Sequence, residues 1–201
     1  VQGDINTQAY RKFDPVNPTD VSIASSLGAA DKKVLGNVLP TYFGAFNSNM
    51  AYKNFDLGFM FRFSGGNKIN NLTRRELLSQ GFNNNGTEIL GRWQSIDNPG
   101  DGWTPRLRDD RETIININQA SSRFVEKGDY IKLDNITLGY NLPKSVLDKV
   151  GLEKFRLFVQ GQNLLIITDY KGLDPEMEVL GNDYNGTPRS RIFSIGLNVG
   201  F

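Results

Sequence analysis

Apolar and polar residues alternate with a period of two along several stretches of the chain. The clearest stretch is "FDLGFMFRFS" (55–64), where every second residue is phenylalanine or leucine and the intervening residues are polar or small, except Met60. The last stretch, "RIFSIGLNVGF", alternates in the same way as far as Phe201. Because successive side chains of a β-strand point to opposite faces, this pattern predicts strands with one apolar and one polar face.

Three further strands are predicted at 41–52, 129–142 and 154–168, which makes five in all. Only Lys53 and Asn54 separate the first predicted strand from the second, and a two-residue link of this kind predicts a hairpin. One short helix is expected near 73–80. A second is expected between 143 and 151, with Ser145 as its N-cap and Gly151 as the residue that ends it.

The connections between the predicted strands are alternately short and long, and the long ones cover about 65–122 and 171–190. In an up-and-down antiparallel sheet all the short connections then lie at one end, an asymmetry that transmembrane β-barrels show. Five aromatic residues map to this short-turn end: Tyr52, Phe55, Tyr140, Phe155 and Phe201. Rings at one level suit a membrane interface, although a soluble β-sandwich also alternates.

Composition excludes several classes of function. The chain of 201 residues has a net charge of +1 and no basic stripe, so no nucleic-acid partner is expected. It contains no cysteine and no histidine, which removes thiolate metal sites, cysteine nucleophiles and the commonest general base. No apolar run approaches the roughly 20 residues of a spanning helix. The polar opening "VQGDINTQ" is not a signal peptide, which leaves either a cytoplasmic protein or a piece of an exported one.

No motif in the chain predicts catalysis. The segment "DNPGDG" (97–102) has Pro99 at the third position of a calcium loop and Arg108 at the twelfth, where glutamate is needed. The acidic pairs Asp109 with Asp110 and Glu176 with Glu178 fit solvated loop charge better than hydrolytic chemistry. We therefore expect no enzyme activity, no metal and no cofactor.

Several stretches taken together resemble the SusC/RagA family of TonB-dependent outer-membrane transporters of Bacteroidetes. These stretches are "GDI" (3–5), "KKVLGN" (32–37), "YKNFDL" (52–57), "GGNKI" (65–69), "SRFVEKGDYIKLDNITLGYNLP" (122–143), "GQNLL" (161–165), "YKGLDPE" (170–176) and "PRSRIFSIGLNVGF" (188–201). Their order and spacing cover nearly the whole chain. One departure is the segment "NTQAYRKFDPVNPTDV" after "GDI", where the family often carries an acidic, glycine-containing segment, so no ion-binding role is transferred there.

The resemblance implies a plugged barrel of about 22 strands. It further implies energy supply through TonB, a SusD-like surface lipoprotein as partner, and import of oligosaccharides or peptides. The expected fold is all-β, with antiparallel up-and-down strands forming the C-terminal part of a transmembrane β-barrel with long extracellular loops. Residues 1–40 would be a polar extracellular loop leading into the barrel, and residues 41–201 the barrel segment. The segments that contact TonB would lie outside this chain.

The resemblance and the alternation together assign roles to individual residues. Membrane-facing positions are expected at Phe55, Leu57, Phe59, Phe61, Phe63, Phe193, Ile195, Leu197 and Val199. Asp56, Gly58, Arg62 and Ser64 would face the lumen. A periplasmic aromatic girdle is expected at Tyr52, Tyr140 and Phe155. The terminal Phe201 would be the signal read by the barrel assembly machinery. Trp93 and Trp103 are candidates for contact with a partner or a sugar, or else they anchor the packing of their own loop.

Five strands cannot close a membrane barrel, because the smallest such barrels use eight. The two outer strands would therefore pair with strands outside this chain. The nine residues 193–201 match the roughly 9 to 11 that a tilted spanning strand requires, as a closing strand would. The alternatives are a soluble all-β glycan-binding module and a secreted β-rich hydrolase, the latter disfavoured by the absence of histidine.

Overall fold

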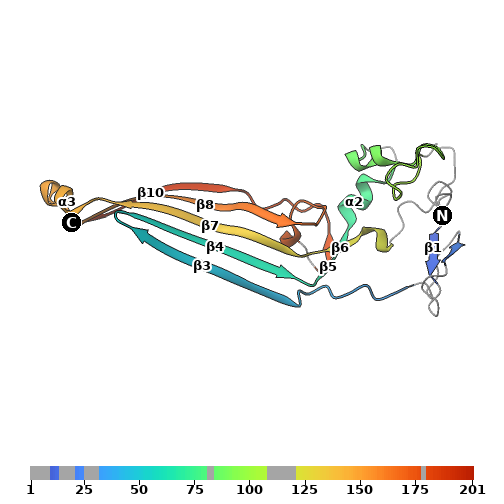
Figure 1. Ribbon diagram of the computed structural model, residues 1–201, viewed down its shortest axis with the longest axis horizontal. Coiled ribbons are helices and arrows are strands. Elements are labelled where there is room, and N and C mark those ends of the chain that lie inside the picture. The colour runs from blue at the N-terminus through green and yellow to red at the C-terminus, as the bar shows by residue number, and fades with distance from the viewer. Residues whose placement is uncertain (1–9, 14–20, 25–31, 81–83, 108–120, 178–179) are drawn as a thin grey trace. The chain divides into compact units, whose positions relative to one another are not determined.

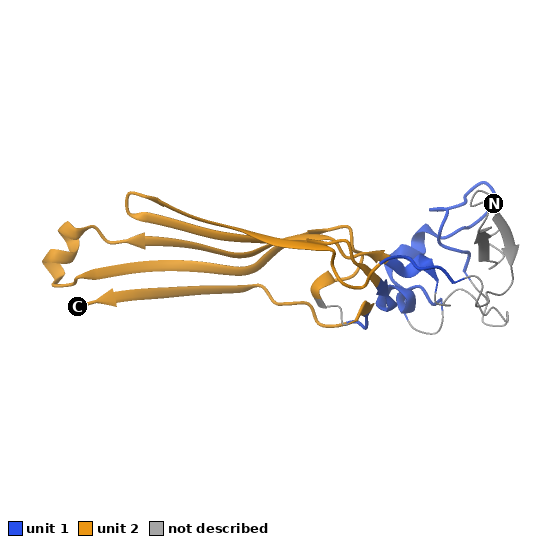
Figure 2. Cartoon of the chain, turned by 90° about the horizontal axis from the view of Figure 1, so that it is seen from below, with its two compact units in different colours: residues 1–36, 70–125, 183–185 blue, residues 37–69, 126–182, 186–201 orange. Residues whose placement is uncertain are grey.

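The computed structural model describes residues 10–13, 21–24, 32–80, 84–107, 121–177 and 180–201 (Figure 1). Asp109, Asp110 and Glu178, three of the acidic residues considered above, lie outside these ranges. The chain divides into two compact units (Figure 2). Unit 1 comprises residues 1–36, 70–125 and 183–185, and unit 2 comprises 37–69, 126–182 and 186–201.

Unit 2 is built on one five-stranded antiparallel sheet with the strand order β10-β8-β7-β4-β3 (Figure 1). Its strands are β3 (Tyr42–Tyr52), β4 (Phe55–Gly65), β7 (Tyr130–Asn141), β8 (Lys154–Thr168) and β10 (Ile192–Gly200). Each of these strands pairs with the next one along the chain. The predicted up-and-down order of five strands is therefore confirmed.

Two short connections lie at the same end of this sheet. Lys53 and Asn54 form the turn between β3 and β4, and Lys53 adopts a positive φ of 54°. Helix α3 (Lys144–Val150) joins β7 to β8. It ends at Gly151, whose φ of 69° suits glycine, and the Leu152 amide closes the helix by donating to the Leu147 carbonyl at 3.2 Å.

The helix begins differently from the sequence prediction. The N-cap is Pro143, not Ser145. The Pro143 backbone is extended, and its carbonyl accepts hydrogen bonds from the amides of Val146 at 2.9 Å and Leu147 at 3.1 Å. Proline lacks the amide hydrogen that a helix start leaves unpaired, so it fits here without a capping side chain. Ser145 falls inside the first turn.

Shorter elements complete the described chain. Strands β1 (Tyr10–Phe13) and β2 (Val21–Ala24) pair with each other, and β6 (Val125–Lys127), β5 (Lys68–Asn71) and β9 (Asn182–Asp183) form a three-stranded sheet in that order. The sequence pattern does not predict these strands, because two to four residues are too few to show a period of two. In the part of the chain that the structure describes, no helix has the length and apolar character needed to cross a membrane.

Unit 1 contains α2 (Leu72–Leu77) and the 3₁₀ turns η2 (Thr87–Gly91) and η3 (Ser122–Phe124). The Asn71 side chain caps α2 by accepting from the Arg74 amide at 2.7 Å. The Arg74 guanidinium pairs with Glu88 and donates to the Arg123 carbonyl at 3.1 Å. Phe124 is fully buried beneath these groups, so α2, η2 and η3 share one small core.

The apolar residues of β7 change phase within the strand, and the structure shows how the sheet absorbs the change. Ile131 and Leu133 occupy odd positions, whereas Ile136, Leu138 and Tyr140 occupy even ones. The register with β4 shifts by one at this point, leaving Asp134 between the pairs Phe61↔Leu133 and Met60↔Asn135. This β-bulge keeps all five apolar side chains on one face.

A polar cluster joins three strands near the short-turn end. Asp56 on β4 accepts a hydrogen bond from Arg156 Nε on β8 at 2.9 Å and another from Asn141 Nδ2 on β7 at 2.8 Å. Arg156 makes a second bond to the same carboxylate, so the pair is bidentate. Gly139 lies beneath it, because an added Cβ would stand 2.5 Å from Arg156 Nη2 and from both Asp56 oxygens.

We expect the substitution Gly139→Ala to separate Asp56 from Arg156 and to lower the free energy of unfolding by about 1 kcal/mol at low salt. Urea titration of the folded protein measures this change. In a background that already carries Asp56→Ala and Arg156→Ala, the same substitution should cost much less, because there is no pair left to separate. An equal cost in both backgrounds would show that Gly139 does not act through this pair.

Candidate functional site

The five-stranded sheet has one continuous apolar face, which the strand register aligns across all five strands. Its members are Phe46, Met50 and Tyr52 on β3; Phe55, Leu57, Phe59, Phe61 and Phe63 on β4; Ile131, Leu133, Ile136, Leu138 and Tyr140 on β7; Phe155, Leu157, Val159, Leu165 and Ile167 on β8; and Phe193, Ile195, Leu197 and Val199 on β10. All nine positions predicted to face the membrane lie on this apolar face.

The apolar face is open in unit 2. Ile195 is 78% exposed and Phe193 is 76% exposed, and most of the other members are at least partly exposed. The shortest of the five strands has nine residues. Strands about 4.8 Å apart with a rise of about 3.3 Å per residue therefore give a face of roughly 700 Å² or more. Soluble monomers rarely expose a contiguous apolar patch above a few hundred Å². The face therefore requires a cover of lipid or protein.

The aromatic residues predicted for a girdle lie together at the short-turn end of this face. Tyr52 is the cross-strand partner of Phe55, which is also the partner of Tyr140. The ring centroids of Phe55 and Tyr140 are 4.9 Å apart. Phe155 is paired with Val199 on the adjoining edge strand. The Lys53 ammonium lies 5.3 Å from the centre of the Tyr52 ring. Phe201 follows the last residue of β10 and is 88% exposed.

The opposite, polar face carries a second charged cluster near the other end of the strands, centred on Glu176 of the turn η4 (Pro175–Met177). The Glu176 carboxylate accepts hydrogen bonds from Lys132 Nζ at 2.5 Å and from the Tyr130 hydroxyl at 2.8 Å. Arg62 Nη2 lies 3.1 Å from Glu176 Oε1 and 3.0 Å from Asp134 Oδ1. The bulged residue Asp134 is thus drawn into the cluster.

The cluster is shielded from solvent. The side chain of Lys132 is only 3% exposed and that of Glu176 only 8%. Burial acts to raise the pKa of the Glu176 carboxyl, but hydrogen bonds from Lys132 and Tyr130 and the charge of Arg62 outweigh it, so the pKa lies below its usual value. Glu176 is therefore an ionised acceptor that holds donors from two strands.

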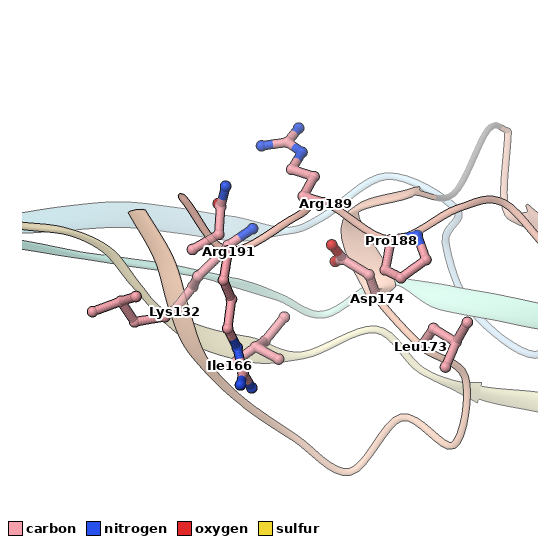
Figure 3. Close-up of a pocket in the computed structure, with 9 residues that line it drawn as sticks. Lys132, Ile166, Leu173, Asp174, Pro188, Arg189 and Arg191 are labelled. Atoms are coloured by element: carbon pink, nitrogen blue, oxygen red, sulfur yellow. The ribbon is translucent and has the colours of Figure 1, made fainter. Parts of the chain in front are cut away.

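A pocket of about 230 Å³ adjoins the cluster (Figure 3). Lys132 and Ile166 line it from the sheet, and Leu173, Asp174, Pro188 and Arg189 line it from the connection between β8 and β10. Arg189 is about half exposed and lies 3.7 Å from Glu176, so its guanidinium is loosely paired. Elsewhere in the described ranges too, no group of three or more acidic residues is arranged to hold a metal ion.

Trp103 lies in a loop of unit 1 that is closed by hydrogen bonds to Asp101. The Asp101 carboxylate accepts from the amides of Trp103 at 2.8 Å and Thr104 at 2.6 Å and from the Thr104 hydroxyl at 2.7 Å. The Trp103 side chain is 73% exposed, whereas Trp93 is partly buried and its amide donates to the Thr104 carbonyl at 2.8 Å. Of the two tryptophans, Trp103 therefore has the free surface.

The Glu176 cluster was not predicted from the sequence, although Arg62 was expected on the polar face. Glu176 was considered only as half of an acidic pair, and Lys132 was not singled out. The two residues are 44 positions apart, and no local pattern signals that they meet. The one available signal was the phase change at Asp134, which marks a bulge beside the cluster.

The outer edges of the sheet are open as well. Among the described strands, β3 pairs only with β4 and β10 pairs only with β8. Each edge therefore presents a row of backbone donors and acceptors that further strands can pair with.

Comparison with known proteins places this sheet in a larger structure. No family model matches the chain. The chain is 37% identical over 193 residues to TonB-dependent receptor P3 of Formosa agariphila. This alignment covers 90% of this chain and 18% of that protein. It is 33% identical over 174 residues to TonB-dependent receptor SusC of Bacteroides thetaiotaomicron, covering 85% of this chain and 16% of that protein. The chain thus spans less than a fifth of these relatives.

Solved structures agree on the fold. The RagAB peptide importer in its closed-closed state superposes with a TM-score of 0.75 over 94% of this chain and 20% of that chain, at 24% identity. Its open-open state gives a TM-score of 0.76 over 96% of this chain, at 23% identity. In sequence the chain is therefore similar to part of the TonB-dependent receptors, SusC among them, and it has the fold of the matching part of RagAB.

Proposed function

We propose that this chain is a wall segment of a TonB-dependent importer that carries oligosaccharides or peptides across the outer membrane. The observation that carries this proposal is the two-faced sheet, with a continuous apolar face suited to lipid and a charged face suited to a water-filled lumen. A soluble glycan-binding module would need another layer to cover the apolar face. The open edges at β3 and β10 would pair with strands from the rest of the protein, since a bilayer leaves no unpaired backbone.

The partners follow from the same proposal. RagAB is a peptide importer, which supports peptides as one substrate class, whereas oligosaccharides are the other class that the family resemblance implies. A SusD-like surface lipoprotein would meet the external side, and TonB would act through parts of the protein outside this chain. The barrel assembly machinery would read Phe201.

The aromatic cluster suggests which end of the sheet faces the periplasm. Tyr52, Tyr140 and Phe155 would form the periplasmic girdle, because amphipathic rings favour the level of the headgroups. The long connections would then be extracellular, where loops carry recognition. Trp103, which is exposed on a hydrogen-bonded loop, is our candidate contact for a sugar or the surface partner, and the Trp93 backbone amide helps to hold that loop by donating to the Thr104 carbonyl.

The first expected outcome concerns the apolar face. In the full-length transporter, Phe59→Arg should lower the free energy of unfolding by about 2 to 4 kcal/mol, because it places a charge near the middle of the bilayer. Thr137→Arg is the matched control, since Thr137 pairs with Gly58 and Gln160 on the polar face, and it should change stability by less than about 0.5 kcal/mol. Similar losses for both variants would mean that the two faces have been assigned wrongly.

The second expected outcome concerns sidedness. Protease added to intact cells should cut within 65–122 and within 171–190 and should spare 143–151, because only the long connections are on the external side. Mass spectrometry of the released fragments locates the cuts. Cleavage at 143–151 in intact cells, or cleavage of the long connections only after the outer membrane is opened, would reverse the topology.

The third expected outcome concerns the last strand. Deletion of Phe201 in the full-length transporter should reduce the amount of heat-modifiable barrel in the outer membrane, because the assembly signal is lost. Val199→Asp should reduce it further, since Val199 lies on the apolar face, whereas Asn198→Ser on the polar face should be mild. Normal amounts for both the deletion and Val199→Asp would show that β10 does not close a membrane barrel.

A further inference from the structure

The connection that leaves β8 is fastened from its first residues. The Thr168 hydroxyl donates to the Asp129 carbonyl at 2.7 Å and accepts from the Tyr170 amide at 3.1 Å. Tyr170 is 5% exposed, and its ring packs so closely over Gly172 that an added Cβ would stand 2.3 Å from it. The Lys171 amide donates to the Glu126 carboxylate at 2.8 Å. The backbone direction is therefore fixed before the η4 turn begins.

The η4 turn is fastened more strongly still. The Asp174 carboxylate accepts from the Glu176 amide at 2.9 Å, which closes the turn, and Pro175 is buried. The Glu176 side chain then enters the shielded cluster with Lys132, Tyr130 and Arg62. Donors from β4 and β7 thus converge on one carboxylate of the connection.

The partners of Glu176 show where the turn lies. Arg62 and Lys132 are cross-strand partners on the polar face. Lys132 is two residues inside the start of β7, which is about 7 Å along the strand. Leu173 and Asp174 also line one pocket together with Lys132 and Ile166 of the sheet, so the turn packs over the polar face near this end of the strands.

We propose that residues 170–177 form a fixed ledge inside the extracellular mouth of the barrel, and that Glu176 is the residue that positions it. The ledge is a permanent part of the wall that a solute passes, not a mobile part of the external loop. Its outward side carries Leu173, which is 65% exposed, beside Asp174 and Arg189 of the adjoining pocket. This inference rests on the proposed function, in which the polar face lines the lumen of the barrel.

Removal of the Glu176 charge and removal of the Lys132 charge should have unequal effects on the ledge. Loss of the Glu176 charge leaves the Lys132 ammonium buried without this carboxylate, which is costly. Loss of the Lys132 charge leaves Glu176 with the Tyr130 hydroxyl and Arg62 still in place. Glu176→Gln should therefore release the ledge more completely than Lys132→Met.

The test is a spin label in the full-length transporter, reconstituted in lipid. One label replaces the exposed side chain of Leu173 through Leu173→Cys, and a reference label uses Tyr184→Cys in the same connection, where Tyr184 is 71% exposed. This chain contains no cysteine of its own, so labelling within it is specific. We expect a several-fold slower label at 173 than at 184, and Glu176→Gln should remove most of that difference while Lys132→Met removes less.

Equal mobility at the two sites before any further change would overturn the ledge, and so would a Leu173 label that Glu176→Gln leaves unaltered. Heat modifiability and quenching of a probe at position 59 by lipid are measured on the same samples. If the barrel is heat-modifiable and lipid quenches the probe at position 59 while the label at 173 moves freely, the ledge proposal is wrong and the proposed membrane barrel is still supported. If position 59 is not reached by lipid, the proposed function fails independently of the ledge.

Discussion

A two-faced sheet works only if every strand keeps the same parity, because a slip of one residue moves an entire apolar set to the other face. Here that constraint extends over five strands and meets a difficulty inside β7, where the apolar residues change from odd to even positions. The bulge at Asp134 removes one residue from the ladder with β4. On β8 two residues, Asn163 and Leu164, lie between the pairs that flank Asp134, so β8 has one residue more than β7 there and its apolar residues stay at odd positions throughout. Two local irregularities thus preserve one continuous apolar surface.

The same bulge serves the polar face. A regular strand would pair Asp134 with a neighbour in the ladder, whereas the bulge leaves it free to accept from Arg62. Arg62 in turn reaches Glu176. The position at which the apolar register is corrected is therefore also the position at which charged side chains join β4, β7 and the following connection. A defect there would disturb both faces together.

The long strands were predictable from the sequence because their alternation is local, and the short links at one end followed from counting residues. The residues predicted for the apolar face and for the aromatic cluster lie on the face of the sheet that the alternation of odd and even positions predicted. The Glu176 cluster was not predictable, because its members come from segments separated by 44 and 114 residues. Pairing of that kind depends on how the connections fold, and polar connections carry no periodicity. The start of α3 was misassigned because serine at the third position after Leu142 resembles a cap, whereas Pro143 needs none.

The distribution of charge along the polar face follows from what holds the strands together at each end. Asp56 with Arg156 joins β4 and β8 across β7 at the short-turn end, and Glu176 with Lys132 and Arg62 joins β4, β7 and η4 at the other. Between them the face presents uncharged residues, among them Gly58, Met60, Asn135, Thr137, Phe158, Gln160 and Ser194. Ion pairs at the ends fix the strands where connections leave the sheet, since the ladder alone cannot resist fraying there. The charged side chains of these two clusters thus join neighbouring strands at the two ends of the polar face, and an uncharged stretch separates the clusters.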